Sequence, residues 1–269
     1  MKLRGAKVTD KGLVKEINED SSLLKYAMYE NENFMLAVVA DGMGGLSCGE
    51  VASSIAISHF ENWYNCFLKE ILMSEDIEEK LLDSWEDLLI VINKEIIRYG
   101  EENSIRYGLG TTLTAALLYK GYIYSVNIGD SRIYKMNEEI GLKQITRDDT
   151  WLQDMLDEIP PHIIKDEKLK KEYKENLMKD NRANRLTQCL GYNNEVSPSY
   201  YKNQLSVEDY YIVCSDGFRN KLEKKSFLEM IEDEKNGLNL KEVLHKKVNL
   251  VKSKKETDNI TAILIKVID

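Results

Sequence analysis

The sequence is poor in several features that mark particular classes of protein. Only three prolines and no glycine- and serine-rich tract occur among its 269 residues, so there is no obvious linker and we expect one domain over residues 1–269. The four cysteines are scattered without a Cys-x-x-Cys pair. No signal peptide and no apolar run long enough to cross a bilayer is visible. These absences predict a cytoplasmic protein without a membrane partner.

Positive charge is also scarce. The chain carries 37 lysines and arginines against 46 acidic residues, which gives a net charge of −9 and an isoelectric point of about 5.1. Binding to nucleic acid or to an anionic membrane needs a basic face, so we expect neither partner. An acidic balance suits cation binding, although most acidic proteins are acidic only for solubility.

The most informative stretch is an apolar run at residues 34–40 that ends in Asp41-Gly42 and is followed by Gly44 and Gly45. This pattern predicts a buried strand that leads into a tight turn and holds a carboxylate at its end. A second run, at residues 210–215, leads in the same way into Asp216-Gly217. Two such strand ends predict two carboxylates at one rim of a sheet.

The remaining patterns predict a mixture of helices and strands. Apolar residues at helical spacing predict two long amphipathic helices, at about 49–71 and 77–99. Strands follow one another without helices between them from residue 113 to 145, so we expect antiparallel pairing, with a hairpin at Gly129-Asp130. The other expected elements are strands at 3–8, 200–205 and 260–267 and helices at 224–232 and 240–252. Residues 151–184, interrupted by Pro160-Pro161 and then highly charged, read as a surface insertion or helical flap.

Five acidic residues lie at strand ends or turns: Asp20, Asp41, Asp130, Asp216 and Asp258. Gathered carboxylates repel one another unless they are protonated or share cations. Oxygen ligands without histidine or cysteine favour Mg²⁺ or Mn²⁺ over zinc, and two such ions can activate water and neutralise a phosphate. An Asp-Gly pair taken alone is more often a plain turn than a ligand site, and the Gly129-Asp130 pair alone is likewise more often a hairpin turn.

The motifs taken together resemble the metal-dependent Ser/Thr protein phosphatases of the PPM family (type 2C) in their bacterial form. The matching pieces occur in the family's order over nearly the whole chain: GLVKEINEDS at 12–21, VVADGMGGLSCGEVAS at 38–53, GLGTTLTAALL at 108–118, VNIGDSRIY at 126–134, RLTQCLG at 185–191, IVCSDGFRN at 212–220 and TDNITAILI at 257–265.

The resemblance implies an α+β fold, a four-layer αββα sandwich with two central, mainly antiparallel β-sheets flanked by helix pairs. It implies hydrolysis of phosphoserine and phosphothreonine on proteins by a metal-bridging water, with two core Mn²⁺ or Mg²⁺ ions. The metal ligands that it assigns are Asp41 and the Gly42 carbonyl, Asp216 and Asp258, with Asp20 and Glu19 acting mainly through metal-bound waters. It also implies a weaker third ion at Asp130 and Asp216.

Two positions depart from the family's pattern. Lys15 stands where the family usually has an arginine that holds the substrate phosphate, so the charge is kept and the bidentate fork is lost. Asp149 stands where an Asp-His pair is common. Lys15 is otherwise an ordinary surface lysine, and these departures leave open a catalytically weak or inactive regulatory relative that binds a phosphoprotein. A hydrolase of small phosphorylated metabolites is a third alternative.

The resemblance further implies partners and a role for the insertion. We expect phosphoprotein substrates, a Ser/Thr kinase whose action the enzyme reverses, and a monomer. The insertion at 151–184 falls where the family has a flap near the active site, although a charged helix is more often only a solvated face.

Overall fold

The computed structural model describes residues 1–44, 48–160, 163 and 165–269. Gly45 and the rest of the glycine-rich motif up to residue 47 lie outside the described residues, as does Pro161 of the proline pair. Among the helices of the described ranges, none combines the length and the apolar character that a membrane span requires.

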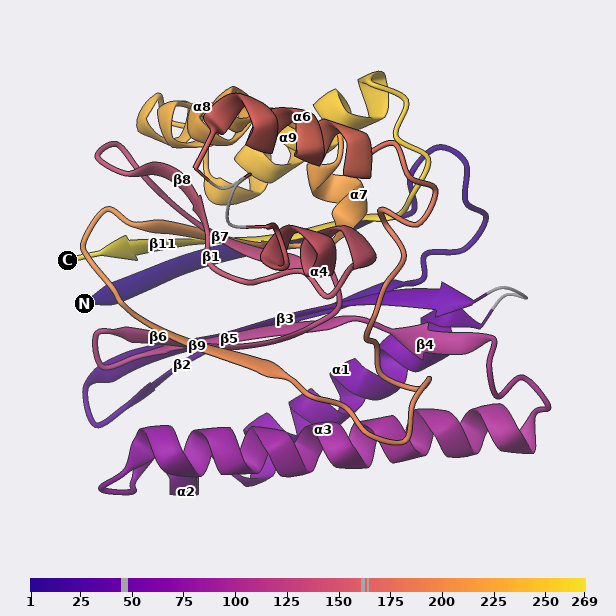
Figure 1. Ribbon diagram of the computed structural model, residues 1–269. Coiled ribbons are helices and arrows are strands. Elements are labelled where there is room, and N and C mark those ends of the chain that lie inside the picture. Colours follow the sequence, from indigo (N-terminus) through magenta and orange to yellow (C-terminus); the bar gives the residue numbers. More distant parts are fainter. Residues whose placement is uncertain (45–47, 161–162, 164) are drawn as a thin grey trace.

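Two antiparallel sheets form the centre of the molecule. The first has the strand order β1 (Lys2–Asp10), β11 (Ile260–Ile268), β10 (Tyr210–Cys214), β7 (Arg132–Asn137) and β8 (Gly141–Gln144). The second has the order β2 (Asp20–Tyr29), β3 (Glu32–Gly44), β5 (Leu113–Tyr119), β6 (Tyr122–Ile128) and β9 (Ser199–Gln204), and β4 (Leu109–Thr111) pairs with the end of β3. The chain's two ends lie side by side, because Lys2 on β1 pairs with Ile268 on β11 (Figure 1).

Helices cover the outer face of each sheet (Figure 1). Those on the second sheet are α1 (Gly49–Cys66), α2 (Leu68–Leu72) and α3 (Ile77–Glu102), and those on the first are α7 (Asp216–Arg219), α8 (Lys224–Lys235) and α9 (Leu240–Ser253). The helix expected at 49–71 is interrupted at Phe67. The predicted four-layer αββα sandwich is confirmed.

Three hydrophobic clusters correspond to the three interfaces of this sandwich. One joins the second sheet to α1, α2 and α3, and it contains the aromatic side chains of Phe60, Trp63 and Trp85. Another joins the first sheet to α8 and α9. The third lies between the two sheets and contains residues from both, such as Val39 and Ile263. Apolar burial on both faces of both sheets is the main stabilising contribution to this arrangement.

Strand β3 shows why the run at 34–40 is apolar without alternation. Leu36 and Val38 point into the cluster with the helices, whereas Ala37 and Val39 point into the cluster between the sheets. A strand that is buried on both faces has no position for a polar side chain, so its sequence reads as a continuous hydrophobic run.

Two local predictions were wrong. Asp41 and Gly42 do not form a tight turn, because β3 continues through them to Gly44 and pairs there with β4. Gly129-Asp130 does not join a hairpin either, because β6 belongs to the second sheet and β7 to the first. Gly129, with φ +98°, lies in a connection that crosses from one sheet to the other. The same residue pair is typical of a two-residue hairpin, so the sequence alone does not distinguish the two kinds of connection.

The sequence prediction also missed a strand. Strand β2 follows the polar turn at 12–19, lies at the edge of the second sheet and is only partly buried, so its sequence DSSLLKYAMY lacks strict alternation. Strand β2 forms because it pairs with β3 over its full length, and this long-range pairing is not visible in the local sequence pattern.

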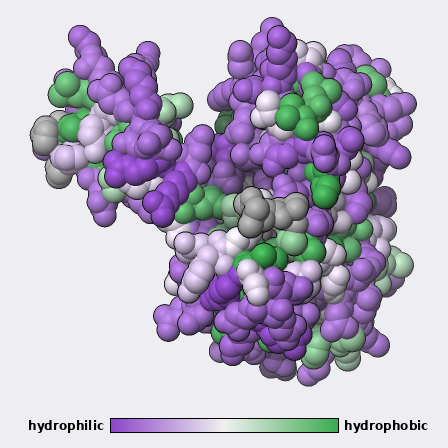
Figure 2. Space-filling model, turned by 90° about the vertical axis from the view of Figure 1, so that its right-hand side faces the viewer, coloured by the Kyte–Doolittle hydropathy of each residue, from purple (hydrophilic) through white to green (hydrophobic). Residues whose placement is uncertain are grey.

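The segment 151–184 contains α4 (Trp151–Asp157) and α6 (Glu167–Leu177). No residue of α4 or α6 is buried, as expected for a charged surface insertion. In Figure 1, α4 lies in front of the first sheet and α6 in front of the helix layer formed by α8 and α9, and Figure 2 shows a hydrophilic lobe standing away from the body at its left.

Candidate metal centre

The first two acids of the candidate site are brought together by strand register. Asp20 opens β2 and pairs directly with Asp41 on β3. The amide of Gly42 donates to the carbonyl of Glu19 over 3.1 Å, which fixes the entry into β2 against the end of β3. A cross-strand pair places side chains within about 5 Å, so these two carboxylates share one local environment.

The other acids come from the first sheet. Asp216 is the first residue of α7, directly after β10, and Asp258 lies just before β11. The two groups are joined by Ser215, whose hydroxyl donates to Asp20 Oδ2 over 2.8 Å. The charge of Asp216 acts on Asp41, but the two residues follow strands of different sheets and not of one sheet, as the sequence had suggested. In Figure 1, β3 runs toward the right-hand side of the sandwich, the side on which α7 is labelled.

Two side chains that the sequence prediction did not assign to the site hold it together. Asn259 accepts from the amide of Glu19 through Oδ1 (2.9 Å), and its Nδ2 donates to the carbonyls of Lys11 and Ile17. It thereby fixes the loop 11–19 against the start of β11. Ser215 accepts from the amide of Thr261 over 3.1 Å in addition to its bond to Asp20. Asn259 and Ser215 stand beside Asp258 and Asp216 in the sequence motifs, but the sequence prediction assigned a role only to the two acids.

Two glycines allow the backbones to approach. A Cβ atom at Gly42 would lie 2.1 Å from the carbonyl oxygen of Gly49 and 2.5 Å from that of Glu19. A Cβ atom at Gly217 would lie 2.0 Å from the carbonyl oxygen of Asn259. These are backbone contacts that cannot move aside, so glycine is required at both positions for the loops of the site to meet.

The carboxylates raise one another's pKa. Desolvation raises the pKa of Asp41 well above its ordinary value, and the charges of Asp20 and Asp216 raise it further. Burial also raises the pKa of Asp20, outweighing the hydrogen bond from Ser215, and burial together with Asp258 raises the pKa of Asp216. The raised pKa values mean that the ionised carboxylates are destabilised in this site, and a bound cation would stabilise them.

The donor set fits a hard divalent cation. Asp20 Oδ1 is buried and has no hydrogen-bond partner among the described residues, which leaves a carboxylate oxygen available to a ligand. Over the part of the chain that the structure describes, no three Asp, Glu, His or Cys side chains already form a ligand cluster. Mg²⁺ and Mn²⁺ accept such a sparse set of oxygens, because water completes their coordination.

Lys15 lies within the site and contacts two of its acids. Its Nζ is 3.0 Å from Glu19 Oε2 and 3.3 Å from Asp258 Oδ1. Burial alone would lower the pKa of Lys15, but these two carboxylates outweigh that effect and raise it. The side chain remains 40% exposed, so its ammonium group can also face a bound anion. Its predicted contact with substrate phosphate stays a prediction.

The two remaining acids have partners of their own. Asp130 is paired with Arg219, whose Nη2 is 3.0 Å from Asp130 Oδ2. Asp149 Oδ2 accepts from the amide of Gly129 over 2.8 Å and from Gln188 Nε2 over 3.2 Å. Asp149 therefore supports the crossover between β6 and β7, which is a structural role.

A hollow of about 630 Å³ adjoins the centre. Met43 and Gly44, which follow Asp41 on β3, form part of its wall, and its other residues come from the loop 107–110, the start of α4 and the segment 182–193. Arg182 stacks on Trp151 at 4.3 Å, and Tyr107 meets Tyr192 edge-on at 5.8 Å. Among the described residues, the lining includes two arginines and no acidic residue: Met43, Gly44, Tyr107, Gly108, Leu109, Gly110, Trp151, Arg182, Arg185, Leu186, Thr187, Gln188, Cys189, Tyr192 and Asn193.

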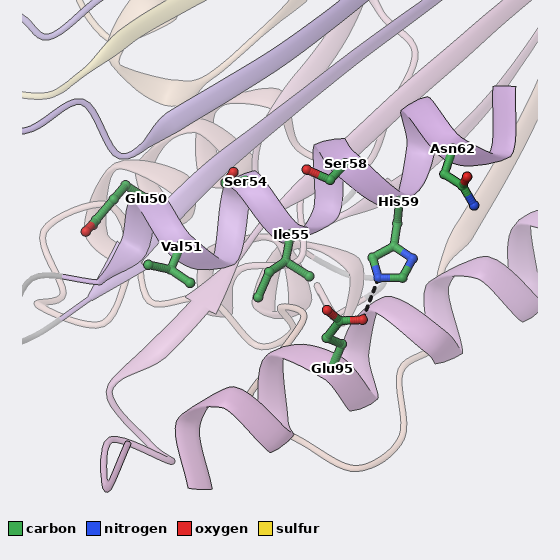
Figure 3. Close-up of a pocket in the computed structure, with 8 residues that line it drawn as sticks. All are labelled: Glu50, Val51, Ser54, Ile55, Ser58, His59, Asn62 and Glu95. Carbon is green, nitrogen blue, oxygen red and sulfur yellow. Dashed lines mark hydrogen bonds and ion pairs between the residues drawn. The ribbon is translucent and has the colours of Figure 1, made fainter. Parts of the chain in front are cut away.

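Other reactive side chains lie away from this centre. His59 Nε2 is 2.7 Å from Glu95 Oε2 across a separate pocket of about 520 Å³ between α1 and α3 (Figure 3). His245 is exposed on α9. Burial raises the pKa of the Cys214 thiol to about 12, so it stays protonated and is not a nucleophile at neutral pH.

This fold is that of a known class of enzyme. A sequence model of the family described as Protein phosphatase 2C matches residues 14–249. Because that match spans most of the sequence, the chain belongs to the protein phosphatase 2C family. The structure confirms the fold that the seven motifs predicted.

Individual relatives agree with this assignment. The serine/threonine phosphatase stp of Listeria monocytogenes is 29% identical over 259 residues, which cover 96% of this chain and 93% of the relative. PstP of Mycobacterium tuberculosis, a serine/threonine protein phosphatase, is 30% identical over 267 residues, 99% of this chain and 45% of PstP.

Solved structures show the same architecture. The catalytic domain of PstP in complex with two manganese ions superimposes with a TM-score of 0.75 and 30% identity and covers 99% of each chain. Stp1, a serine/threonine phosphatase from Staphylococcus aureus, gives a TM-score of 0.80 at 25% identity, covering all of this chain and 96% of Stp1.

Proposed function

We propose that this chain is a metal-dependent protein-serine/threonine phosphatase that works as one domain with two core Mn²⁺ or Mg²⁺ ions. The observation that carries the proposal is the raised pKa of Asp20, Asp41 and Asp216, which burial and one another's charges cause, together with a buried oxygen of Asp20 that has no partner among the described residues. Its relative PstP holds two manganese ions on the same fold.

The residues present assign a role to each part of the centre. Asp41 and the Gly42 carbonyl, together with Asp216 and Asp258, would hold the ions, and Glu19 and Asp20 would act mainly through their water ligands. When bound, such ions activate water and neutralise the charge on a phosphate. Lys15 would hold a phosphate oxygen through its ammonium group, and the raised pKa of Lys15 keeps that group charged.

The hollow beside the centre supports protein substrates over small metabolites. A phosphate ester needs only the centre itself, whereas the aromatic side chains and two arginines that line the hollow together with Met43 offer contacts to a longer ligand. We therefore propose phosphoserine and phosphothreonine proteins as substrates, with a Ser/Thr kinase as the opposing activity. A monomer acting in the cytoplasm completes the proposal.

The deciding experiment measures phosphate release from an aryl phosphate and from a phosphothreonine peptide, with Mn²⁺, with Mg²⁺ and with a chelator. We expect release that depends on the metal, stops with chelator and is absent from Asp216→Asn. Binding of the phosphopeptide with negligible hydrolysis in saturating Mn²⁺ would instead support a regulatory relative. Preference for small phosphate esters over peptides would support a metabolite hydrolase.

A further inference from the structure

Arg219 holds the acid that resemblance assigns to a third metal ion. Asp130 lies in the crossover between β6 and β7, and Arg219 is the last residue of α7, three residues after Asp216. Nη2 of Arg219 donates to Asp130 Oδ2 over 3.0 Å and to the backbone carbonyl of Asp130 over 3.1 Å. Both the side chain and the main chain of this acid are thus engaged by one guanidinium group.

The same guanidinium group is linked to Asp216. Nη1 of Arg219 donates to Asn220 Oδ1 over 3.1 Å, and Asn220 Nδ2 donates to Asp216 Oδ2 over 3.1 Å. Arg219 and Asn220 therefore connect Asp130 to Asp216, the two carboxylates that would have to share a third ion.

This ion pair is shielded from solvent. The side chains of Arg219 and Asp130 are only 12% and 14% exposed, so water and salt screen their attraction less than at the surface. The neighbouring guanidinium group of Arg132 is engaged elsewhere, because its Nε donates to Asp148 Oδ1 over 2.8 Å. A guanidinium group remains charged at every physiological pH, so the cation at Asp130 is permanent.

We propose that Arg219 takes the place of a third metal ion, so that this chain binds divalent ions at its core but not at Asp130. An ion entering there would have to displace two hydrogen bonds and remain beside a buried positive charge. The proposal rests on the proposed metal centre for its context, but it concerns a difference between variants that can be measured without any turnover.

The test counts Mn²⁺ ions bound by the purified full chain after removal of metal, using calorimetric titration and the electron paramagnetic resonance signal of free Mn²⁺. We expect Arg219→Gln and Arg219→Ala each to bind one ion more than the unmodified protein, with lower affinity than the core ions. Arg219→Lys keeps a positive charge and should bind no extra ion. Circular dichroism establishes that each variant is folded, and the glutamine variant retains the size of the side chain if alanine disturbs the fold.

The position of the extra ion is tested with Asp130→Asn. In the unmodified protein this change should leave the ion count as it was, and in the Arg219→Gln background it should remove the added ion. An equal count in the unmodified protein and the Arg219→Gln variant overturns the proposal, as does an ion lost from the unmodified protein on Asp130→Asn. The core count of the unmodified protein separately tests the proposed function.

Discussion

Asp20 and Asp41 are cross-strand partners in register, although 21 positions separate them in the chain. Asp20 alone is tied to the other sheet, through Ser215, while Asp41 lies beside the backbone of Thr112, whose hydroxyl accepts from the Asp41 amide over 3.0 Å. The register of β2 on β3 thus decides that the motif around Glu19 and the motif around Gly42 act as one site.

Asp41→Asn should remove core metal binding and activity together. The change removes the negative charge of the residue whose pKa the neighbouring carboxylates raise, and loss of metal-site groups costs affinity by about 10–100-fold or more. Calorimetry with Mn²⁺ and phosphate release measure the two effects. Asp180→Asn, at a partly exposed acid that forms an ion pair with Arg182, is the matched control. An Asp41→Asn protein that still hydrolyses phosphopeptide would remove Asp41 from the centre.

The metal-free protein should become less stable as pH rises. Burial raises the pKa of Asp20 from 3.8 to about 7, so between pH 4 and pH 7 the folded chain retains a proton that the unfolded chain has released. The free energy of unfolding therefore falls across this window and has lost the whole contribution above it. Thermal melts at pH 5 and pH 7.5, with chelator, measure the fall; each kcal/mol corresponds to roughly 2–4 °C for a chain of this size.

Asp20→Asn serves as the control for this pH dependence. The amide cannot ionise, so the fall in melting temperature between pH 5 and pH 7.5 should become smaller in the variant. An identical pH dependence in both proteins would show that Asp20 is not responsible. Added Mn²⁺ should stabilise the unmodified protein more at pH 7.5 than at pH 5, because protons compete with the metal for the same oxygens.

Lys15→Arg tests the proposed contact with phosphate. An arginine can hold two phosphate oxygens where lysine holds one, so we expect a lower KM or a higher kcat/KM for the phosphothreonine peptide. Lys15→Met, which keeps the length and removes the charge, should lower kcat/KM. If neither variant changes kcat/KM, Lys15 serves only as the counter-charge to Glu19 and Asp258 that the structure shows.

Arg185→Glu tests the hollow beside the centre. Arg185 is exposed on the wall of the hollow, whose described residues include no acid. Reversing its charge should therefore weaken the binding of phosphopeptides that carry acidic residues beside the phosphorylated residue. We expect kcat/KM to fall by about 10-fold, equivalent to about 1.4 kcal/mol, for an acidic phosphopeptide and to stay unchanged for an aryl phosphate. Arg98→Glu, on the exposed face of α3, is the control. An equal loss on both substrates would point to damage at the centre.

Gly217→Ala should destabilise the protein through backbone contact. The added Cβ atom would lie 2.0 Å from the Asn259 carbonyl oxygen, so one of the two loops has to move. Such overpacking costs about 1–3 kcal/mol, and it should also weaken Mn²⁺ binding because Asp216 and Asp258 flank the contact. Gly108→Ala meets its nearest neighbour only at 3.6 Å and should leave the melting temperature close to that of the unmodified protein.

Much of the candidate site could be predicted because its chemistry is local in the sequence. Each acid follows or precedes a buried strand, and the glycines beside Asp41 and Asp216 are required by contacts that any protein of this geometry would have. The continuous apolar runs at 34–40 and 210–214 directly reflect burial on both faces of a strand. The family's order of motifs then linked these pieces to one fold.

What the sequence could not show is which segments pair across long distances. A glycine-aspartate pair looks the same in a hairpin and in a crossover between sheets, and a partly buried edge strand such as β2 has no alternation to reveal it. The contact between Arg219 and Asp130 joins residues 89 positions apart, so no local pattern predicts it.

The sequence by itself therefore determined most of the elements, the acids and the metal that they suit, since these depend on residue type and on the periodicity of burial. Only the tertiary structure decided which partner each charge has. Charges interact through space, and the energy of each depends on its distance from others and on its exposure to water. For this reason Asp20 and Asp41 meet at one rim, while Asp130 is held by an arginine of the chain itself.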